Sequence, residues 1–225
     1  MTTAPKATLL PVYVLADESH SMGRHIGELN QGLDDLHEAL LAQPMAAAKV
    51  RFSIVGFSDD VKVRMRLADL RATDRLPRLV SRGRTNYRKA FADLRHRLPA
   101  DVRRLKAEGY AVHRPAVFML TDGQPSDDRW HDEHRMLIDH DATPGAPNII
   151  ACGIGAARPE TIVEVATRPE FAFVALAGVD VGVAVAQFCT ALTHSIIHSV
   201  PARAAGPARL VVEQPAGFEM AIDVV

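Results

Sequence analysis

The sequence contains little cysteine, almost no net charge and no long apolar run, and each of these shortages excludes a class of protein. The two cysteines, Cys152 and Cys189, are too few for a disulfide framework in 225 residues, so we expect buried free thiols in a reducing compartment. A formal net charge of −1 provides no field that would attract nucleic acid or an anionic membrane. No apolar run looks long enough to cross a bilayer. We therefore expect a cytoplasmic protein without a nucleic-acid partner or a membrane span.

The motifs of several enzyme classes are also missing. The chain has no Gly-x-Ser-x-Gly nucleophile elbow, no Walker-type phosphate loop and no Gly-x-Gly-x-x-Gly after a strand. His131 with His134, and His194 with His198, have helical spacing, but neither pair has a glutamate placed as in a zinc protease. We expect these histidines to lie on the surface in water.

Short apolar runs alternate with amphipathic segments along most of the chain. Continuous runs predict strands buried on both faces, whereas the strict alternation in 61–67 predicts an antiparallel edge strand. The predicted strands are residues 12–16, 50–57, 61–67, 116–120, 148–152 and 171–176, and the predicted helices are 26–40, 86–97 and 181–200. Pro99 is expected to break or restart the second helix. This alternation predicts an α/β fold: a doubly wound, mostly parallel six-stranded sheet with one antiparallel edge strand and helices on both faces.

The chain divides into one domain and a tail. We assign residues 8–200 to the domain and residues 201–225 to a C-terminal extension. The extension has a start rich in Pro, Gly and Ala and a short apolar end, so it either packs on the domain or is flexible.

Polar residues follow two of the predicted core strands. Asp17, Ser19 and Ser21 follow the first at alternate positions, and Asp122 follows the strand 116–120. Open parallel sheets bind ligands beyond the carboxyl ends of their strands, where the strand order reverses. If the two strands are neighbours at that point, the four side chains converge, and the loop before the next helix could add Thr85. All of them offer oxygen, which suits Mg²⁺ or Mn²⁺.

The pattern Asp17-x-Ser19-x-Ser21, followed by Thr85 and by Asp122 in Leu-Thr-Asp-Gly, resembles the metal-ion-dependent adhesion site of von Willebrand factor A domains. Strand and helix order also agree with that Rossmann-like family from about residue 11 to about residue 200.

Within that superfamily, the flanking sequence resembles the bacterial tellurite-resistance-associated, TerY-like proteins. The similar segments are Leu10-Pro-Val-Tyr-Val-Leu, Leu120-Thr-Asp-Gly-Gln-Pro-Ser-Asp-Asp and Ile150-Ala-Cys-Gly-Ile-Gly155. The chain differs from the usual pattern in Glu18 and His20, which occupy the variable positions of the first motif, and in Arg84, which replaces a glycine. None of these differences removes a ligand.

The resemblance implies a bound Mg²⁺-type ion with one open position that an Asp or Glu of a partner protein fills. Mg²⁺ or Mn²⁺ is expected, and Ca²⁺ less so. The implied ligands are Asp17, Ser19, Ser21, Thr85 and Asp122. Three basic residues near Thr85 in the sequence, Arg82, Arg84 and Arg88, are expected to reinforce an acidic ligand. By analogy, the partner would be a co-encoded kinase or phosphatase, or another stress-response protein.

A binding module that is not an enzyme is thus the main hypothesis, and a phosphoryl-transfer enzyme using Asp17 with Mg²⁺ is the alternative. Aspartate-nucleophile phosphatases also place a carboxylate after the first strand of a doubly wound sheet, but usually carry a second aspartate where Ser19 stands here. Asp59-Asp60 and Asp127-Asp128 are expected in turns, and Trp130 in packing rather than at a partner surface.

Overall fold

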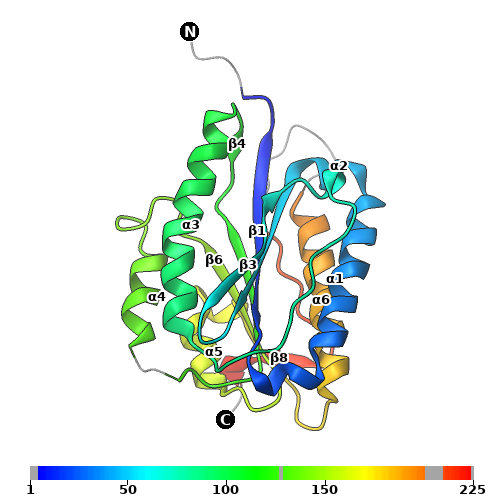
Figure 1. The fold of residues 1–225 in the computed structure, drawn as a ribbon, viewed down its shortest axis with the longest axis vertical. Helices are drawn as coiled ribbons and strands as arrows, with labels where there is room; N and C mark the ends of the chain where they lie inside the picture. The colour runs from blue at the N-terminus through cyan, green and yellow to red at the C-terminus, as the bar shows by residue number, and fades with distance from the viewer. Residues whose placement is uncertain (1–4, 127–128, 201–209, 224–225) are drawn as a thin grey trace.

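The structure, a computed structural model, describes residues 5–126, 129–200 and 210–223. These residues form one eight-stranded sheet in the order β3-β2-β1-β5-β6-β7-β8, with the short β4 beside the start of β1 (Figure 1). Strands β1, β2, β5, β6 and β7 are parallel, whereas β3 and β8 are antiparallel to their neighbours. The strands are β1 (Thr8–Asp17), β2 (Val50–Phe57), β3 (Val61–Ala68), β4 (Ala111–Val112), β5 (Ala116–Thr121), β6 (Asn148–Gly153), β7 (Ala172–Ala175) and β8 (Phe218–Met220).

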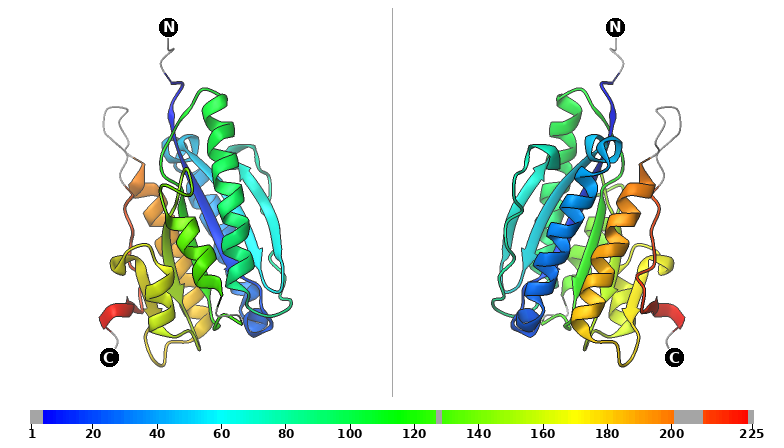
Figure 2. Two further views of the ribbon diagram at one scale, coloured as in Figure 1. Left: turned by 90° about the vertical axis from the view of Figure 1, so that its left-hand side faces the viewer. Right: turned by 90° about the vertical axis from the view of Figure 1, so that its right-hand side faces the viewer.

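Helices cover both faces of the sheet. Figure 2 shows α3, α4 and α5 over one face and α1 and α6 over the other. The helices are α1 (Ile26–Leu41), α2 (Pro44–Lys49), α3 (Tyr87–Ala107), α4 (Trp130–Ile138), α5 (Pro159–Val165) and α6 (Val181–Ser199), with four 3₁₀ turns, η1 (His20–Arg24), η2 (Leu70–Ala72), η3 (Pro169–Phe171) and η4 (Ala221–Asp223). The predicted doubly wound α/β fold is confirmed.

The sheet has two more strands than the six predicted. Strand β4 has two residues and β8 has three, too few for either to show a periodic pattern in the sequence. Strand β8 comes from the predicted extension and pairs antiparallel with β7, so the sheet has a second antiparallel edge. Residues 201–209 and 224–225 of that extension, and the predicted turn Asp127-Asp128, lie outside the described residues.

The helical predictions need three corrections. Pro99 lies inside α3 instead of ending it, because the buried residues of this helix before and after Pro99 hold both halves on the sheet despite one missing N–H donor. Helix α2 was not predicted; its first residue is Pro44, a position where proline's fixed φ favours a helix. The sequence analysis also missed α4 and α5, which have only nine and seven residues.

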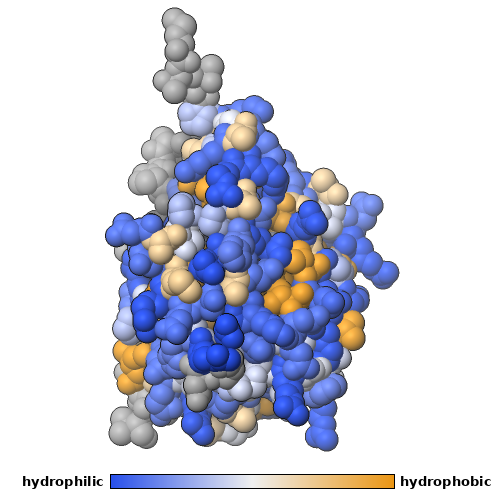
Figure 3. Space-filling model, turned by 60° about the vertical axis from the view of Figure 1, so that its left-hand side comes forward, coloured by the Kyte–Doolittle hydropathy of each residue, from blue (hydrophilic) through white to orange (hydrophobic). Residues whose placement is uncertain are grey.

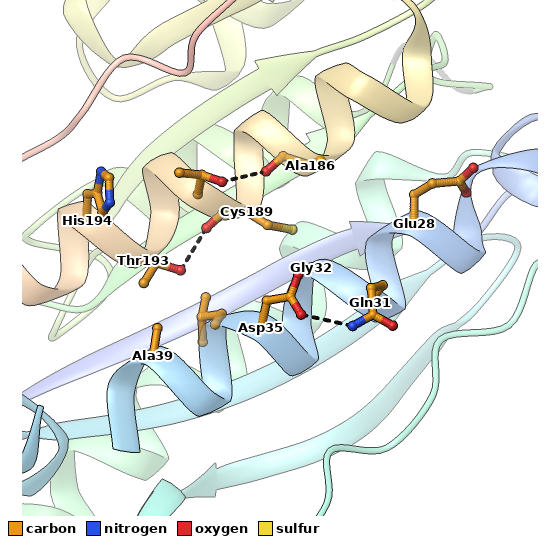
Figure 4. A pocket seen from close by; sticks show the side chains of 11 residues that line it. Glu28, Gln31, Gly32, Asp35, Ala39, Ala186, Cys189, Thr193 and His194 are labelled. Carbon is orange, nitrogen blue, oxygen red and sulfur yellow. Dashed lines mark hydrogen bonds between the residues drawn. The ribbon is translucent and has the colours of Figure 1, made fainter. Parts of the chain in front are cut away.

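Helices α1 and α6 pack closely at one point. Gly32 faces Cys189: a Cβ added to Gly32 would lie 2.5 Å from the Cys189 Sγ (Figure 4). A cleft of about 390 Å³ runs between the two helices around this contact. Both Cys189 and Cys152 are buried free thiols, as predicted, and burial raises the pKa of Cys189 to about 12.

By length and composition, α6 is the one described helix that could cross a membrane, with a mean hydropathy of 1.3. Our expectation that no run is long enough was therefore too strict. Half of that segment is buried inside the domain, as is typical of a core helix, so length and composition do not establish a membrane span.

The face covered by α3 and α4 is tied together by aromatic side chains. Trp130 is 2% exposed and packs edge-on against Tyr87, which confirms the packing interpretation. His134 was expected in water but is buried, because it lies on the inner side of α4 and its Nε2 is 2.8 Å from the Val165 carbonyl oxygen. Burial lowers the pKa of His134. Outside this core, Figure 3 shows a largely hydrophilic surface on which apolar side chains form small, separate groups.

Candidate metal centre

The strand order reverses between β1 and β5, which pair in parallel at the middle of the sheet. Their carboxyl ends lie together at the lower end of the sheet in Figure 1. Asp17 is the last residue of β1, and Asp122 directly follows β5. The two strands are therefore neighbours, as the predicted convergence requires, and the two carboxylates lie at the reversal point of a doubly wound sheet.

The segment after β1 turns so that its alternate side chains face Asp122. The backbone N–H of Ser19 donates to Asp17 Oδ1 at 2.8 Å, which fixes the turn. The Ser19 and Ser21 hydroxyl oxygens are 3.0 Å apart, and Ser21 donates to Asp122 Oδ1 at 2.8 Å. Ser21 is exposed, so the cluster opens to solvent on its side.

The loop before α3 adds the fifth predicted residue. Thr85 is 7% exposed, and its hydroxyl donates to Asp17 Oδ2 at 3.4 Å. The structure thus brings all five predicted residues together. The sequence analysis missed Thr121, whose hydroxyl donates to the same Asp17 oxygen at 2.6 Å, and Gly123, where an added Cβ would lie 2.8 Å from Thr85 Oγ1. Both flank Asp122 in the Leu-Thr-Asp-Gly segment at the end of a core strand, which was the available clue.

The two carboxylates are buried, and one basic side chain nearby, His25, acts to lower the pKa of Asp122. Asp17 is 0% exposed and Asp122 is 8% exposed. Burial raises the pKa of both carboxyl groups, although hydrogen bonds from Thr121 and Ser19 to Asp17, and from Ser21 to Asp122, act in the opposite direction. Among the described residues, no lysine or arginine forms an ion pair with either. A divalent cation would provide the charge that this pair lacks, so the cluster fits such an ion.

No other candidate metal cluster emerges from the part of the chain that the structure describes. It contains no group of three or more His, Cys, Asp and Glu side chains that could hold a metal ion. Asp59 is exposed and Asp60 forms ion pairs with Arg82 and Lys62, which fits the predicted turn. The hydroxyl and carboxylate cluster is therefore the candidate metal centre.

One predicted role in the surroundings is wrong. Arg82 does not face the cluster, because its guanidinium is bound to Glu18 and Asp60. Arg84 and Arg88 are both exposed, so their role in reinforcing an acidic ligand stays a prediction. Glu18 is buried and turned away from the five oxygen donors, toward Gly56, Arg64 and Arg82.

The fold and the site together define a doubly wound α/β domain that gathers five oxygen-bearing side chains at the reversal point of its sheet. The model of the von Willebrand factor type A domain matches residues 12–178, and the chain belongs to this family. No curated protein sequence matches the chain significantly.

Solved structures show the same fold at low sequence identity. Proximal thread matrix protein 1 of the mussel byssus is 18% identical, with a TM-score of 0.59, over 86% of this chain and 49% of that one. The pilus adhesin SpaC of Lactobacillus rhamnosus GG is 14% identical, with a TM-score of 0.66, over 88% of this chain and 31% of the adhesin. A von Willebrand factor type A protein of Catenulispora acidiphila is 13% identical, with a TM-score of 0.54, over 87% and 47%. The chain thus spans about half the length of the mussel and Catenulispora proteins and about a third of the length of the adhesin.

Proposed function

We propose that this domain is a metal-dependent protein-binding module whose ion docks an acidic residue of a partner protein. The observation that carries the proposal is the cluster of Asp17, Ser19, Ser21, Thr85 and Asp122, brought together from three separate segments. Membership of the von Willebrand factor type A family supports it. The mussel matrix protein of the same fold has been solved with zinc in its metal-ion-dependent adhesion site (MIDAS) motif, which supports a divalent ion in such a site.

Each member of the cluster has a definite task in this proposal. The three hydroxyl groups and two carboxylates would hold the ion, and the ion would supply an electrophilic centre for an incoming carboxylate. Asp17 is held by Thr121 and by the Ser19 N–H, so its oxygens are fixed in place before any ion binds. The exposed Ser21 leaves the approach for a partner open, and the exposed Arg84 adds positive charge near Thr85.

The finer assignments rest on chemistry and on resemblance. Hard oxygen donors favour Mg²⁺ or Mn²⁺ over Ca²⁺, which prefers more ligands. The flanking segments support a TerY-like role in a bacterial tellurite or stress-response system, with a co-encoded kinase or phosphatase as partner. The two unpaired thiols support a reducing, cytoplasmic location.

The alternative, phosphoryl transfer through Asp17, has less support. Asp17 is completely buried, and its two carboxylate oxygens already accept hydrogen bonds from Ser19, Thr85 and Thr121. A nucleophile must reach the phosphorus atom of a bulky phosphoryl group, whereas a small ion needs only a remaining lone pair on these carboxylate oxygens. We therefore propose a binding function and no catalysis.

The test is calorimetric titration of the protein with Mg²⁺ and Mn²⁺. We expect saturable binding by the wild type that is lost in Asp17→Ala and Ser19→Ala. A matched control is Asp69→Asn, because Asp69 binds Arg51 and Arg71 at the opposite end of β2 and should not affect the ion. A folded wild type that binds neither ion would contradict the proposal. A positive result is followed by titration with acidic peptides in Mg²⁺ and in chelator, where binding should require the ion.

A further inference from the structure

Glu18 lies between two predicted ligands but points the opposite way. Asp17 and Ser19 face the oxygen cluster, whereas the Glu18 side chain is 0% exposed and lies against β2. A Cβ added to Gly56 would lie 2.3 Å from the Glu18 carboxyl carbon, so only glycine at that position leaves room for this carboxylate. The three consecutive residues thus serve two sides of the same strand end.

Four donors from two other segments hold this buried carboxylate. From β3, Arg64 Nε donates to Oε1 at 2.8 Å and its terminal nitrogen to Oε2 at 3.0 Å. From the loop before α3, Arg82 Nε donates to Oε2 at 2.7 Å and the Val80 N–H to Oε1 at 3.1 Å. Arg82 also binds Asp60, so the negative charge of Glu18 is compensated by two arginines, one of which it shares with a second carboxylate. A buried carboxylate needs such compensation.

The loop before α3 also lies alongside residues 18–20, and hydrogen bonds join the two segments. The Arg82 N–H donates to the Glu18 carbonyl, and the His20 N–H donates to the Gly83 carbonyl at 3.1 Å. The Ser81 hydroxyl donates to the Ser19 carbonyl at 3.1 Å. This loop carries Thr85, the one predicted ligand that lies neither at the end of β1 or β5 nor in the segment directly after it. Glu18 and Arg82 therefore join the two segments that carry four of the five oxygen donors.

We infer that Glu18 is a positioning residue of the metal centre: through Arg82 it fixes the Thr85 loop against the Ser19–Ser21 segment, so that ion affinity depends on a side chain that never touches the ion. This inference rests on the proposed function for its effect on affinity. Its structural part, the attachment of the loop, does not depend on an ion. Outer-shell partners of metal ligands commonly change affinity by about 10–100-fold when removed.

The first measurement is hydrogen exchange of the metal-free protein, which tests the attachment alone. Glu18→Gln should speed exchange in residues 79–86 while leaving the core strands unchanged. Arg82→Met should have the same effect, and it leaves Arg64 on the Glu18 carboxylate, so it provides the test if Glu18→Gln does not fold. Asp69→Asn is the control and should exchange like the wild type. Unchanged exchange at 79–86 in folded Glu18→Gln and Arg82→Met would overturn the inference.

The second measurement is a double-mutant cycle on Mn²⁺ affinity. We expect Glu18→Gln and Thr85→Val each to weaken binding by about tenfold or more, and the double variant to be no weaker than Thr85→Val alone. A general loss of stability would instead give independent, multiplying effects, which would overturn the positioning role. If the wild type binds no ion, the proposed function fails, and the exchange result alone decides on Glu18.

Discussion

At the scale of single residues, Gly123 shows how closely the backbone surrounds the oxygen cluster. An added Cβ would lie 2.8 Å from Thr85 Oγ1 and 3.7 Å from Asp17 Oδ2. The backbone of Gly123 is not in the left-handed region, so alanine would meet no backbone strain there. The constraint at this position is therefore space beside the Thr85 hydroxyl.

We expect Gly123→Ala to weaken Mg²⁺ and Mn²⁺ binding by about tenfold, because the new methyl group displaces the Thr85 hydroxyl. The free energy of unfolding should change by less than about 1 kcal/mol, since a hydroxyl can rotate away at little cost. Calorimetry and urea unfolding measure the two effects. Gly27→Ala is the matched control, because an added Cβ there meets nothing within 4 Å. Wild-type affinity in Gly123→Ala would contradict the placement of Thr85 in the site.

The raised pKa values of Asp17 and Asp122 predict a pH dependence of ion binding. Burial is the main cause of both shifts. The ion binds the carboxylates, so protons compete with it up to a higher pH than they would at exposed carboxyl groups. Affinity should therefore fall as the pH falls through the raised pKa values, and binding should release protons. Calorimetry in two buffers of different ionisation enthalpy detects that release; the absence of any release below neutral pH would contradict the shifts.

The metal-free protein should show the opposite trend in stability. Because the folded state keeps the Asp17 proton to a higher pH than the unfolded state does, the folded state binds more protons between the two pKa values. The contribution of Asp17 to the free energy of unfolding thus declines as the pH rises through that range. Urea unfolding in chelator should show this decline in the wild type and less of it in Asp17→Asn.

The predicted residues of the site stand in local sequence motifs, whereas the contacts that were missed join residues far apart in the chain. Four of the five oxygen donors stand directly at or after predicted strand ends, and Thr85 precedes a predicted helix, so their convergence follows from the order of the elements. The contacts of Thr121 with Asp17 and of Arg82 with Glu18 join residues 104 and 64 positions apart. No local pattern marks such pairs, and Arg82 was therefore assigned to the ligand instead of to Glu18.

At the scale of elements, α1 offers two glycines in contrasting surroundings. Gly27 has open space around its Cβ position, whereas a Cβ on Gly32 would lie 2.5 Å from the Sγ and 2.7 Å from the Cβ of Cys189 (Figure 4). The second contact involves an atom fixed to the α6 backbone, so it cannot be relieved by a side-chain rotation. Gly32 therefore sets the distance between α1 and α6.

We expect the same substitution to have opposite effects at these two positions. Gly32→Ala should lower the free energy of unfolding by about 1–3 kcal/mol, because the helices must separate. Gly27→Ala should be neutral or stabilising by up to about 1 kcal/mol, because alanine is the better helix former. Urea unfolding of the two variants measures both. Adding Cys189→Ala should restore only part of the loss at Gly32, since the close Cβ remains; equal stability of both glycine variants would contradict this packing.

The helices and strands that were predicted have a strong local sequence pattern, and those that were missed do not. Strand β2 was predicted with its observed bounds, since apolar residues dominate 50–57 and the turn Ser58-Asp59-Asp60 follows directly. Helix α3 was interrupted at Pro99 in the prediction, because local rules count the lost hydrogen bond but not the burial of the flanking residues against the sheet. Strand β8 depends wholly on its partner β7, which no local pattern reveals.

At the scale of the whole molecule, the candidate centre joins segments that are far apart in the chain. The donors come from residues 17–21, from Thr85 and from Asp122, and they meet only when β1 and β5 pair and α3 is in place. The unfolded chain has no such arrangement, so an ion that fits the centre binds the folded state alone. The hydrophobic core is closed without any ion, with the strands on either side of the centre fully buried.

Two results follow for the thermal stability of the protein. The metal-free chain should fold, and Mg²⁺ at about 100 times its dissociation constant should raise the free energy of unfolding by about 2.7 kcal/mol. For a domain of this size, that corresponds to an increase of about 5–10 °C in the unfolding temperature. Differential scanning calorimetry in chelator and in a Mg²⁺ series measures the increase.

The variants decide where such stabilisation originates. Asp17→Ala should lose the response to Mg²⁺, whereas Asp69→Asn should keep it, because Asp69 lies at the opposite end of β2. An equal increase in Asp17→Ala would place the ion elsewhere on the protein. A metal-free chain that does not fold would instead show that the ion is part of the core, because the two buried carboxylates would then cost more than the rest of the packing contributes.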